Sequence, residues 1–276
     1  MLIVDNNLNT SHNKYQKASF MKIYFLSFGG PSNDYHDAVE RICKQAESFE
    51  LFDKIIGLTE TDLQNDEEFW TKHKDFITSN PRGYGYWLWK PYIIKKTLES
   101  MDRDDILLYA DCGCELNYMG KNKLFDFIEL VKIKNIIGTS AGSSDYNFTK
   151  MDLTKYLQME NNIDLLKIRH MQATTLMMVK NDLIIKLINE YYEIGSNNYH
   201  FIDDTPSIQT NTCDFIEHRH DQSIFSLLVK KYGLLNYDLN PTDWGYGLPA
   251  KNNYLIDGIQ YPIWTCRNRT GISIHD

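Results

Sequence analysis

Two neighbouring stretches of the chain hold most of the residues that could do chemistry. The first, Arg82–Pro91, reads RGYGYWLWKP and places Arg82 and Lys90 among glycines and aromatic rings. The second, Asp105–Cys114, is an apolar run that ends on the carboxylate Asp111. Open α/β sheets bind ligands beyond the carboxyl ends of their strands, and rings combined with cations suit a sugar or a nucleotide. We therefore expect a ligand pocket where the strand before Asp111 ends.

Within the first stretch, Arg82 and Lys90 are candidate partners for a phosphate or carboxylate, and the rings are candidate stacking surfaces (Tyr84, Tyr86, Trp87 and Trp89). The two indoles share a face if the segment is extended; the alternative is that one or both belong to the core. Lys90 stands where Pro91 favours the first turn of a helix. A cation is unfavourable there, so we expect a negative group close to Lys90.

Three other positions complete the candidate site. Phe28 and Gly29 end the first expected strand, where glycine can admit a nucleotide close to the backbone or simply make a turn. Asp111 could hold a divalent cation that bridges two phosphates, bind a ribose or sugar hydroxyl, or cap its own loop. Asp221 is expected to open a helix and could face the same cleft.

The order of apolar runs predicts the elements that position these residues. Strands are expected at Ile23–Phe28, Lys54–Leu58, Ile106–Ala110, 135–138 and 173–179. Helices are expected between them, at 35–49, 66–77, 91–100, 124–131, 183–192 and 220–231. This alternation predicts an α/β fold with a Rossmann-like, mostly parallel sheet flanked by helices on both faces.

Composition limits the class of protein. The 276 residues are 42% apolar and 24% charged, which predicts a globular chain. The net charge of -8 argues against nucleic acid as a partner. The five cysteines are scattered, which favours a reducing compartment. No signal peptide or membrane span is expected, so we expect a cytoplasmic protein with a flexible extension over residues 1–20 and a single domain over 21–276.

In this order, four of these segments resemble the GT-A glycosyltransferases, enzymes that use nucleotide-sugar donors. The segments are Lys22–Phe28, Leu107–Gly113, Gln172–Asn181 and His220–Leu228, spread over most of 21–231. The block GYWLWKP also looks like one found in uncharacterised viral and bacterial members. The resemblance implies a GT-A-like fold, with donor or acceptor contacts at further residues of these segments (Gln172, Thr174, His220 and Gln222).

The same resemblance implies a divalent cation, Mn²⁺ or Mg²⁺, held by an Asp-x-Asp strand end and often by a late histidine. Here Asp111 matches the first aspartate, Gly113 replaces the second, and His275 would have to be the late histidine. Without a metal, cations would have to stabilise the leaving diphosphate, and the candidates are Arg82, Lys90, Arg267 and Arg269.

The function expected is transfer of a sugar from a UDP- or GDP-sugar to a hydroxyl acceptor such as a glycan. Asp221 is then a candidate base or sugar contact. Gly113 favours the alternative, a degenerate protein of the same fold that binds carbohydrate or nucleotide without catalysis. A nucleotidyltransferase is a third class, but it usually needs a cation in the glycine loop after the first strand, and Gly29-Gly30-Pro31 is not followed by one.

Overall fold

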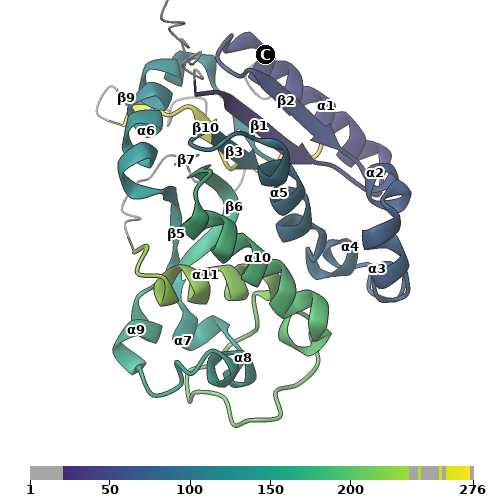
Figure 1. Ribbon diagram of the computed structural model, residues 1–276, viewed down its shortest axis with the longest axis vertical. Coiled ribbons are helices and arrows are strands. Elements are labelled where there is room, and N and C mark those ends of the chain that lie inside the picture. The colour runs from purple at the N-terminus through teal and green to yellow at the C-terminus, as the bar shows by residue number, and fades with distance from the viewer. Residues whose placement is uncertain (1–20, 236–241, 244–254, 257–258, 274–276) are drawn as a thin grey trace, which may run out of the picture.

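A computed structural model describes residues 21–235, 242–243, 255–256 and 259–273 of the chain (Figure 1). The predicted extension at 1–20 and the candidate ligand His275 lie outside the described residues. None of the helices in the described part of the chain has the length and apolarity needed to span a bilayer.

A five-stranded sheet forms the centre of the fold, in the order β2-β1-β3-β6-β5. Its strands are β1 (Ile23–Phe28), β2 (Lys54–Leu58), β3 (Ile106–Ala110), β5 (Ile136–Ser144) and β6 (Arg169–Val179). Strand β1 pairs in parallel with β2 and β3, whereas β6 is antiparallel to both β3 and β5. The sheet is therefore mostly parallel, as predicted, with one reversed strand.

Helices cover both faces of this sheet (Figure 1). Helices α1 (Asn33–Ser48) and α6 (Lys121–Lys134) pack on one face, and α5 (Trp89–Ser100), α10 (Asp182–Asn197) and α11 (His220–Lys231) pack on the other. Side chains of each strand point alternately to the two faces of the sheet. Ile23 and Phe25 pack in the core beneath α1 and α6, whereas Tyr24 and Leu26 pack in the core beneath α5, α10 and α11. The α/β class with helices on both faces is confirmed.

The starts of several helices follow from side-chain caps. Asp66 accepts the backbone N–H of Phe69 at 3.1 Å and begins α3 (Glu67–Ser79), and Asn181 accepts that of Ile184 at 3.0 Å and begins α10. Such caps satisfy N–H groups that the first turn leaves without partners.

The remaining elements are short: α2 (Glu60–Asn65), α4 (Gly83–Tyr86), β4 (Glu115–Leu116), η1 (Tyr118–Gly120), α7 (Asp145–Phe148), α8 (Met151–Tyr156), α9 (Ile163–Lys167), η2 (Tyr199–Phe201), β7 (Thr242–Asp243), β8 (Leu255–Ile256), β9 (Ile259–Gln260) and β10 (Ile263–Trp264).

The segment labelled α4 is a left-handed turn, not the extended strand that would align the two indoles. Five consecutive residues have positive φ, from 59° at Gly83 through 52° at Tyr84, 79° at Gly85 and 53° at Tyr86 to 60° at Trp87. Each non-glycine residue in this region costs about 1–2 kcal/mol. The turn is nevertheless closed by backbone hydrogen bonds and by the Trp89 indole N–H, which donates to the Gly83 carbonyl at 3.0 Å.

A buried histidine, His73, joins α3 to both α10 and η2. The two ring nitrogens of His73 lie 2.8 Å from the hydroxyls of Tyr192 and Tyr199. Burial disfavours the imidazolium and, with a smaller contribution from Lys72, lowers the pKa of His73 to about 4. The neutral ring therefore serves as donor to one phenol and acceptor from the other.

We predict that Gly85→Ala destabilises the protein more than Gly233→Ala. Both glycines have positive φ, 79° and 68°, but a Cβ at Gly85 would lie 2.7 Å from Ile77 Cγ1, whereas no atom lies within 4 Å of one at Gly233. Backbone strain alone should cost Gly233→Ala about 1 kcal/mol, and overpacking should add about 1–3 kcal/mol at Gly85. Urea unfolding measures both, and equal losses would contradict the packing argument.

The stability of the protein should depend on pH through His73. In the unfolded chain this ring gains a proton near its ordinary pKa of 6.5, whereas in the folded protein it does so only near 4. The contribution of the neutral ring to the free energy of unfolding is therefore fully present above pH 6.5 and is lost as the pH falls to 4. We expect the free energy of unfolding of the wild type, relative to His73→Gln, to fall by on the order of 3 kcal/mol over this range. A difference that stays constant with pH would show that His73 is not buried in its neutral form.

Candidate functional site

A pocket of about 600 Å³ opens where β1 and β3 end and α11 begins. Although the chain is acidic, the described residues that line this pocket include five cations but only two carboxylates (Arg82, Lys90, Arg219, Arg267 and Arg269, with Asp111 and Asp221). This is the location that the sequence predicts for a ligand, and its size is typical of small-molecule sites.

Lys90 lies at the floor of the pocket and is only 3% exposed. Its ammonium nitrogen is 3.1 Å from Asp111 Oδ1 and 3.5 Å from Asp221 Oδ2, and it donates to the Ala173 carbonyl at 3.1 Å. These carboxylates are the negative groups expected near Lys90. The ammonium ion thus joins α5, the end of β3, β6 and the start of α11 at one point.

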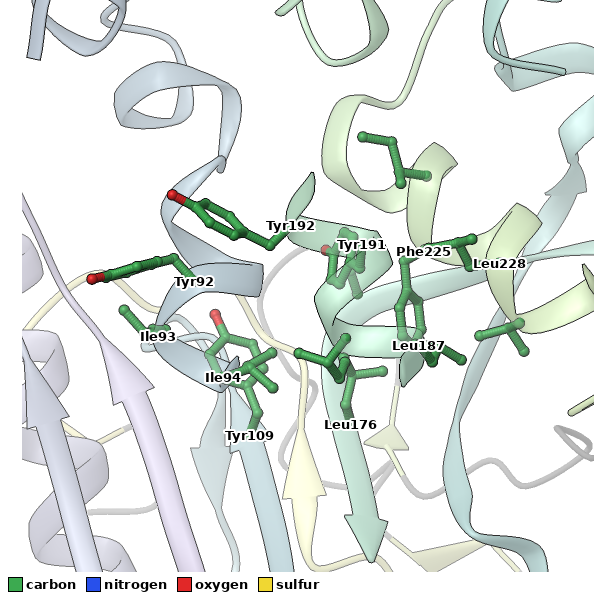
Figure 2. Close-up of a cluster of buried hydrophobic side chains, with 14 of the residues drawn as sticks. Tyr92, Ile93, Ile94, Tyr109, Leu176, Leu187, Tyr191, Tyr192, Phe225 and Leu228 are labelled. Carbon is green, nitrogen blue, oxygen red and sulfur yellow. The ribbon is translucent and has the colours of Figure 1, made fainter. Parts of the chain in front are cut away.

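Two buried phenols complete this charge network, and sequence reasoning missed both. The Tyr109 hydroxyl donates to Asp111 Oδ1 at 2.6 Å, and the Tyr191 hydroxyl donates to Asp221 Oδ2 at 2.9 Å. Figure 2 shows both tyrosines within the apolar cluster between the sheet and α10. Tyr109 is two residues before Asp111 and therefore points to the same face of the strand, so this spacing could have predicted their contact. Tyr191 is 30 residues from Asp221, and no local spacing rule predicts that contact.

The pKa shifts follow from burial and from charge. Burial opposes the charged form of Lys90, but the two carboxylates outweigh it and raise the pKa of the ammonium group above its ordinary value. Burial raises the pKa of Asp221, with Lys90 and Tyr191 acting in the opposite direction. Burial and the neighbouring carboxylates raise the pKa of both Tyr109 and Tyr191, which keeps them as neutral donors.

The two aspartates differ in access to the pocket. The Asp111 side chain is 31% exposed, whereas that of Asp221 is 5% exposed. Asp111 can therefore accept hydrogen bonds from a ligand while Lys90 and Tyr109 hold its Oδ1 atom. Asp221 also lines the pocket, but Lys90 and Tyr191 both contact its Oδ2 atom, so its role is first of all to balance the charge of Lys90.

Aromatic rings form one wall of the pocket. Phe28 stacks on Trp89 with ring centroids 4.0 Å apart, and Trp87 stacks on His220 at 5.5 Å. Trp89 is buried, which agrees with the core interpretation for this indole, whereas Tyr84 and Trp87 are partly exposed. Burial lowers the pKa of His220, so its ring is neutral and presents an apolar face.

Other predicted contacts divide between the pocket and its supports. Thr174 and Gln222 line the pocket; the Thr174 carbonyl accepts from the Asp111 N–H, and Gln222 accepts from the Ala173 N–H. Gln172 does not line it, because this buried side chain bonds to Thr139 and Ser140 on β5. Gly29 does not line it either: a Cβ there would lie 2.1 Å from the Tyr35 carbonyl oxygen, so glycine is needed for close packing against α1.

Arginines near α4 and α11 are paired with acids. Arg82 lies 2.8 Å from Asp204, and Arg219 lies 2.8 Å from Glu217. All four side chains are roughly half exposed, so each pair is worth only about 0–1 kcal/mol and can open for a ligand. Asp204 also approaches His220 Nε2 at 3.6 Å, which connects the loop before α11 to the pocket.

The described residues do not fit the divalent cation that the sequence resemblance implies. Among them, no three His, Cys, Asp or Glu side chains gather as metal ligands. Asp111 is the one acid of the strand-end motif, and its Oδ1 atom already has an ammonium ion 3.1 Å away. A hard divalent cation prefers several oxygen ligands, and a neighbouring lysine opposes it by charge.

We predict that Lys90→Met destabilises the protein by about 3–5 kcal/mol at pH 7, because it leaves the buried Asp221 carboxylate, with Asp111 nearby, without its cation. The loss should be smaller at pH 5, because protonation of Asp221, whose pKa is already raised, relieves the repulsion. Lys96→Met on the same helix, whose side chain is 43% exposed, is the matched control and should change the stability by less than about 0.5 kcal/mol. Similar losses in both variants would mean that the ion pairs of Lys90 contribute little.

Comparisons with known proteins concern the fold. No protein-family model and no curated protein matches the sequence. A solved glycosyltransferase involved in glycosylation of the major capsid of PBCV-1 is similar with 13% identity and a TM-score of 0.36, over 63% of this chain and 66% of that one. The chain thus spans about two thirds of the length of that protein. Mouse xyloside xylosyltransferase 1 in its apo form is similar with 8% identity and a TM-score of 0.45, over 92% of this chain and 99% of the mouse protein.

Proposed function

We propose that this protein is a glycosyltransferase of the GT-A type that moves a sugar from a nucleotide-diphosphate donor to a hydroxyl acceptor. The observation that carries the proposal is Asp111, a partly exposed carboxylate fixed by buried Lys90 on the floor of a pocket rich in cations and aromatic rings. Such a pocket offers cations for a diphosphate, rings for apolar faces and a carboxylate for hydroxyl groups.

Each part of the pocket has a role in this reaction. Asp111 accepts hydrogen bonds from hydroxyls of the donor ribose or of the transferred sugar. Phe28, Tyr84 and Trp87 shape the wall against which the donor rests. The acceptor oxygen bonds to the sugar as the bond between the sugar and the diphosphate breaks, and the acceptor proton passes to solvent or to the leaving diphosphate. The cations of the pocket stabilise the negative charge that grows on the leaving nucleoside diphosphate.

Asp221 is less accessible than a general base needs to be. A base must reach the acceptor hydroxyl directly or through one water molecule, and both Lys90 and Tyr191 hold the Oδ2 atom of Asp221 in place. In this proposal Asp221 positions Lys90 rather than taking the proton of the acceptor hydroxyl.

One observation favours a second function, that of a degenerate protein that binds nucleotide or carbohydrate without catalysis. Gly113 stands where the GT-A pattern has its second aspartate, and the described residues do not make a metal site. Retained ligand binding without any transfer or hydrolysis of the donor would favour this function.

A thermal-shift screen against UDP, GDP, CDP and their common sugars, each with Mn²⁺ and with EDTA, tests the donor class. A ligand that binds only the folded protein raises its melting temperature. We expect a shift with one nucleotide family, persisting in EDTA because Lys90 already neutralises charge beside Asp111. No shift with any nucleotide at millimolar concentration would contradict the proposed function.

Asp111→Asn is expected to reduce turnover of that donor by roughly 100-fold or more. The amide keeps the shape of the side chain and can still accept from Tyr109, and Lys90 keeps its contact with Asp221, so the melting temperature should change little. Asp126→Asn, at a side chain 69% exposed on α6, is the matched control and should retain full activity. Full activity of Asp111→Asn would remove this residue from the reaction.

A further inference from the structure

The C-terminal segment 261–273 borders the pocket beside β3. Its strand β10 pairs antiparallel with β4, so that Trp264 lies opposite Glu115. Glu115 directly follows residues 111–114, the loop between β3 and β4, which we call the Asp111 loop. Further along this segment, Arg267 and Arg269 both line the pocket, and the Arg269 guanidinium lies over the Tyr35 ring at 5.4 Å. Two cations from the far end of the sequence thus reach the cavity that Asp111 faces.

A buried ion pair holds this segment in place. Arg41 of α1 lies 3.4 Å from Glu115, and their side chains are 4% and 0% exposed. The Arg41 guanidinium also donates to the carbonyls of Cys112, Cys114 and Asn268, at 2.8, 3.0 and 3.2 Å. One side chain therefore fastens both the Asp111 loop and the C-terminal segment to α1.

Glu115 and Asn268 complete the attachment. The Asn268 side-chain amide donates to Glu115 Oε1 at 2.6 Å and to the Ile272 carbonyl at 2.7 Å, and its backbone N–H donates to the Gly113 carbonyl at 2.9 Å. Glu115 Oε2 accepts from Ser273 at 3.1 Å. Asn268 stands between the two arginines, so its bonds fix the backbone from which both side chains extend.

The backbone of this segment also covers the position of the missing aspartate. A Cβ on Gly113 would lie 3.4 Å from Arg267 Cα and 3.8 Å from the Asn268 carbonyl oxygen. Where the GT-A pattern has a carboxylate that binds a cation, this chain therefore presents a glycine that contacts the backbone of an arginine. The side chain of that arginine lines the same pocket as Asp111.

We infer that Arg41 and Glu115 are positioning residues: they hold segment 261–273 so that Arg267 and Arg269 bind the diphosphate of the ligand and balance its charge without a divalent cation. The inference rests on the proposed function for the identity of the ligand. It assigns the anion to the side of the pocket formed by α1, the Asp111 loop and the C-terminal segment.

Binding of inorganic pyrophosphate in EDTA, measured by titration calorimetry, tests the anion site without any assumption about the sugar or the base. We expect the double variant Arg267→Gln/Arg269→Gln to weaken binding roughly 10- to 100-fold, because charge-assisted hydrogen bonds are lost. Arg103→Gln is the matched control, because this exposed arginine pairs with Asp182 away from the pocket. The affinity of this variant for pyrophosphate should equal that of the wild type.

The outcomes separate this inference from the proposed function. Unchanged pyrophosphate affinity in the double variant, or no pyrophosphate binding by the wild type, overturns the role of the two arginines even if a nucleotide sugar is transferred. Weakened pyrophosphate binding supports that role even if no nucleotide sugar in the screen is a donor.

The positioning role is tested with Glu115→Gln and Asn268→Ala. Trypsin cleaves after Arg267 and Arg269, so mass spectrometry of a short digest reports how firmly the segment is held. We expect faster cleavage at these two sites in both variants, slower cleavage when pyrophosphate is added to the wild type, and about tenfold weaker pyrophosphate binding. If Glu115→Gln does not fold, Asn268→Ala decides the question, because it removes a bond by which Glu115 holds the segment and leaves the Arg41–Glu115 pair intact. Wild-type affinity and cleavage in a folded Asn268→Ala variant would overturn the inference, since a purely structural bond would change only the melting temperature.

Discussion

The pocket depends on one buried cation. An ammonium ion at 3% exposure needs a carboxylate partner, and Lys90 has two, the partly exposed Asp111 and the buried Asp221. These three residues come from α5, the end of β3 and the start of α11. The hydroxyls of Tyr109 and Tyr191 donate to the two carboxylates and so connect them to the interior of β3 and to α10. Elements that are distant in sequence are thereby fixed around one atom. The carboxylate that faces the ligand is consequently rigid before any ligand arrives, which is the condition under which a hydrogen-bonding group contributes most to binding.

The aromatic wall is built at the cost of backbone strain. Tyr84, Tyr86 and Trp87 all lie in the left-handed region, where side chains are unfavourable by about 1–2 kcal/mol each. Such strain persists only where the surroundings over-determine the conformation, and it gathers at functional sites. Here the surroundings are the Gly85 contact with Ile77, the Trp89 bond to Gly83 and the stack of Trp87 on His220. The turn directs Tyr84 and Trp87 toward the pocket. The residues after the turn begin α5, whose first turn places Lys90 at the floor of the pocket.

The strands and helices could be predicted from the periodicity of apolar residues. The contacts between residues distant in sequence could not. The apolar runs at Ile23–Phe28 and Ile106–Ala110 match β1 and β3, because strands buried on both faces read as continuous apolar segments. The negative partners of Lys90 were expected from a local rule about helix termini. By contrast, no local pattern signals five successive left-handed residues, the reversed direction of β6 or the pairing of Tyr191 with Asp221. The Arg41–Glu115 pair joins residues separated by 74 positions and carries no motif. What the sequence conceals is therefore the set of polar contacts that bring distant segments to the pocket.

Charge is distributed unevenly around the pocket, and this limits what each side can bind. Beside α4 and α11, Arg82 and Arg219 come with Asp204 and Glu217, so that side offers donors and acceptors together. A hydroxyl group, which both donates and accepts, can bond to such a pair without displacing either member, whereas a phosphate would have to overcome the acid. On the other side, Arg269 rests on an aromatic ring, with Arg267 beside it on the same segment. If the diphosphate binds beside the C-terminal segment, as inferred above, the side of the pocket beside α11 is left for the sugar hydroxyls under the proposed function.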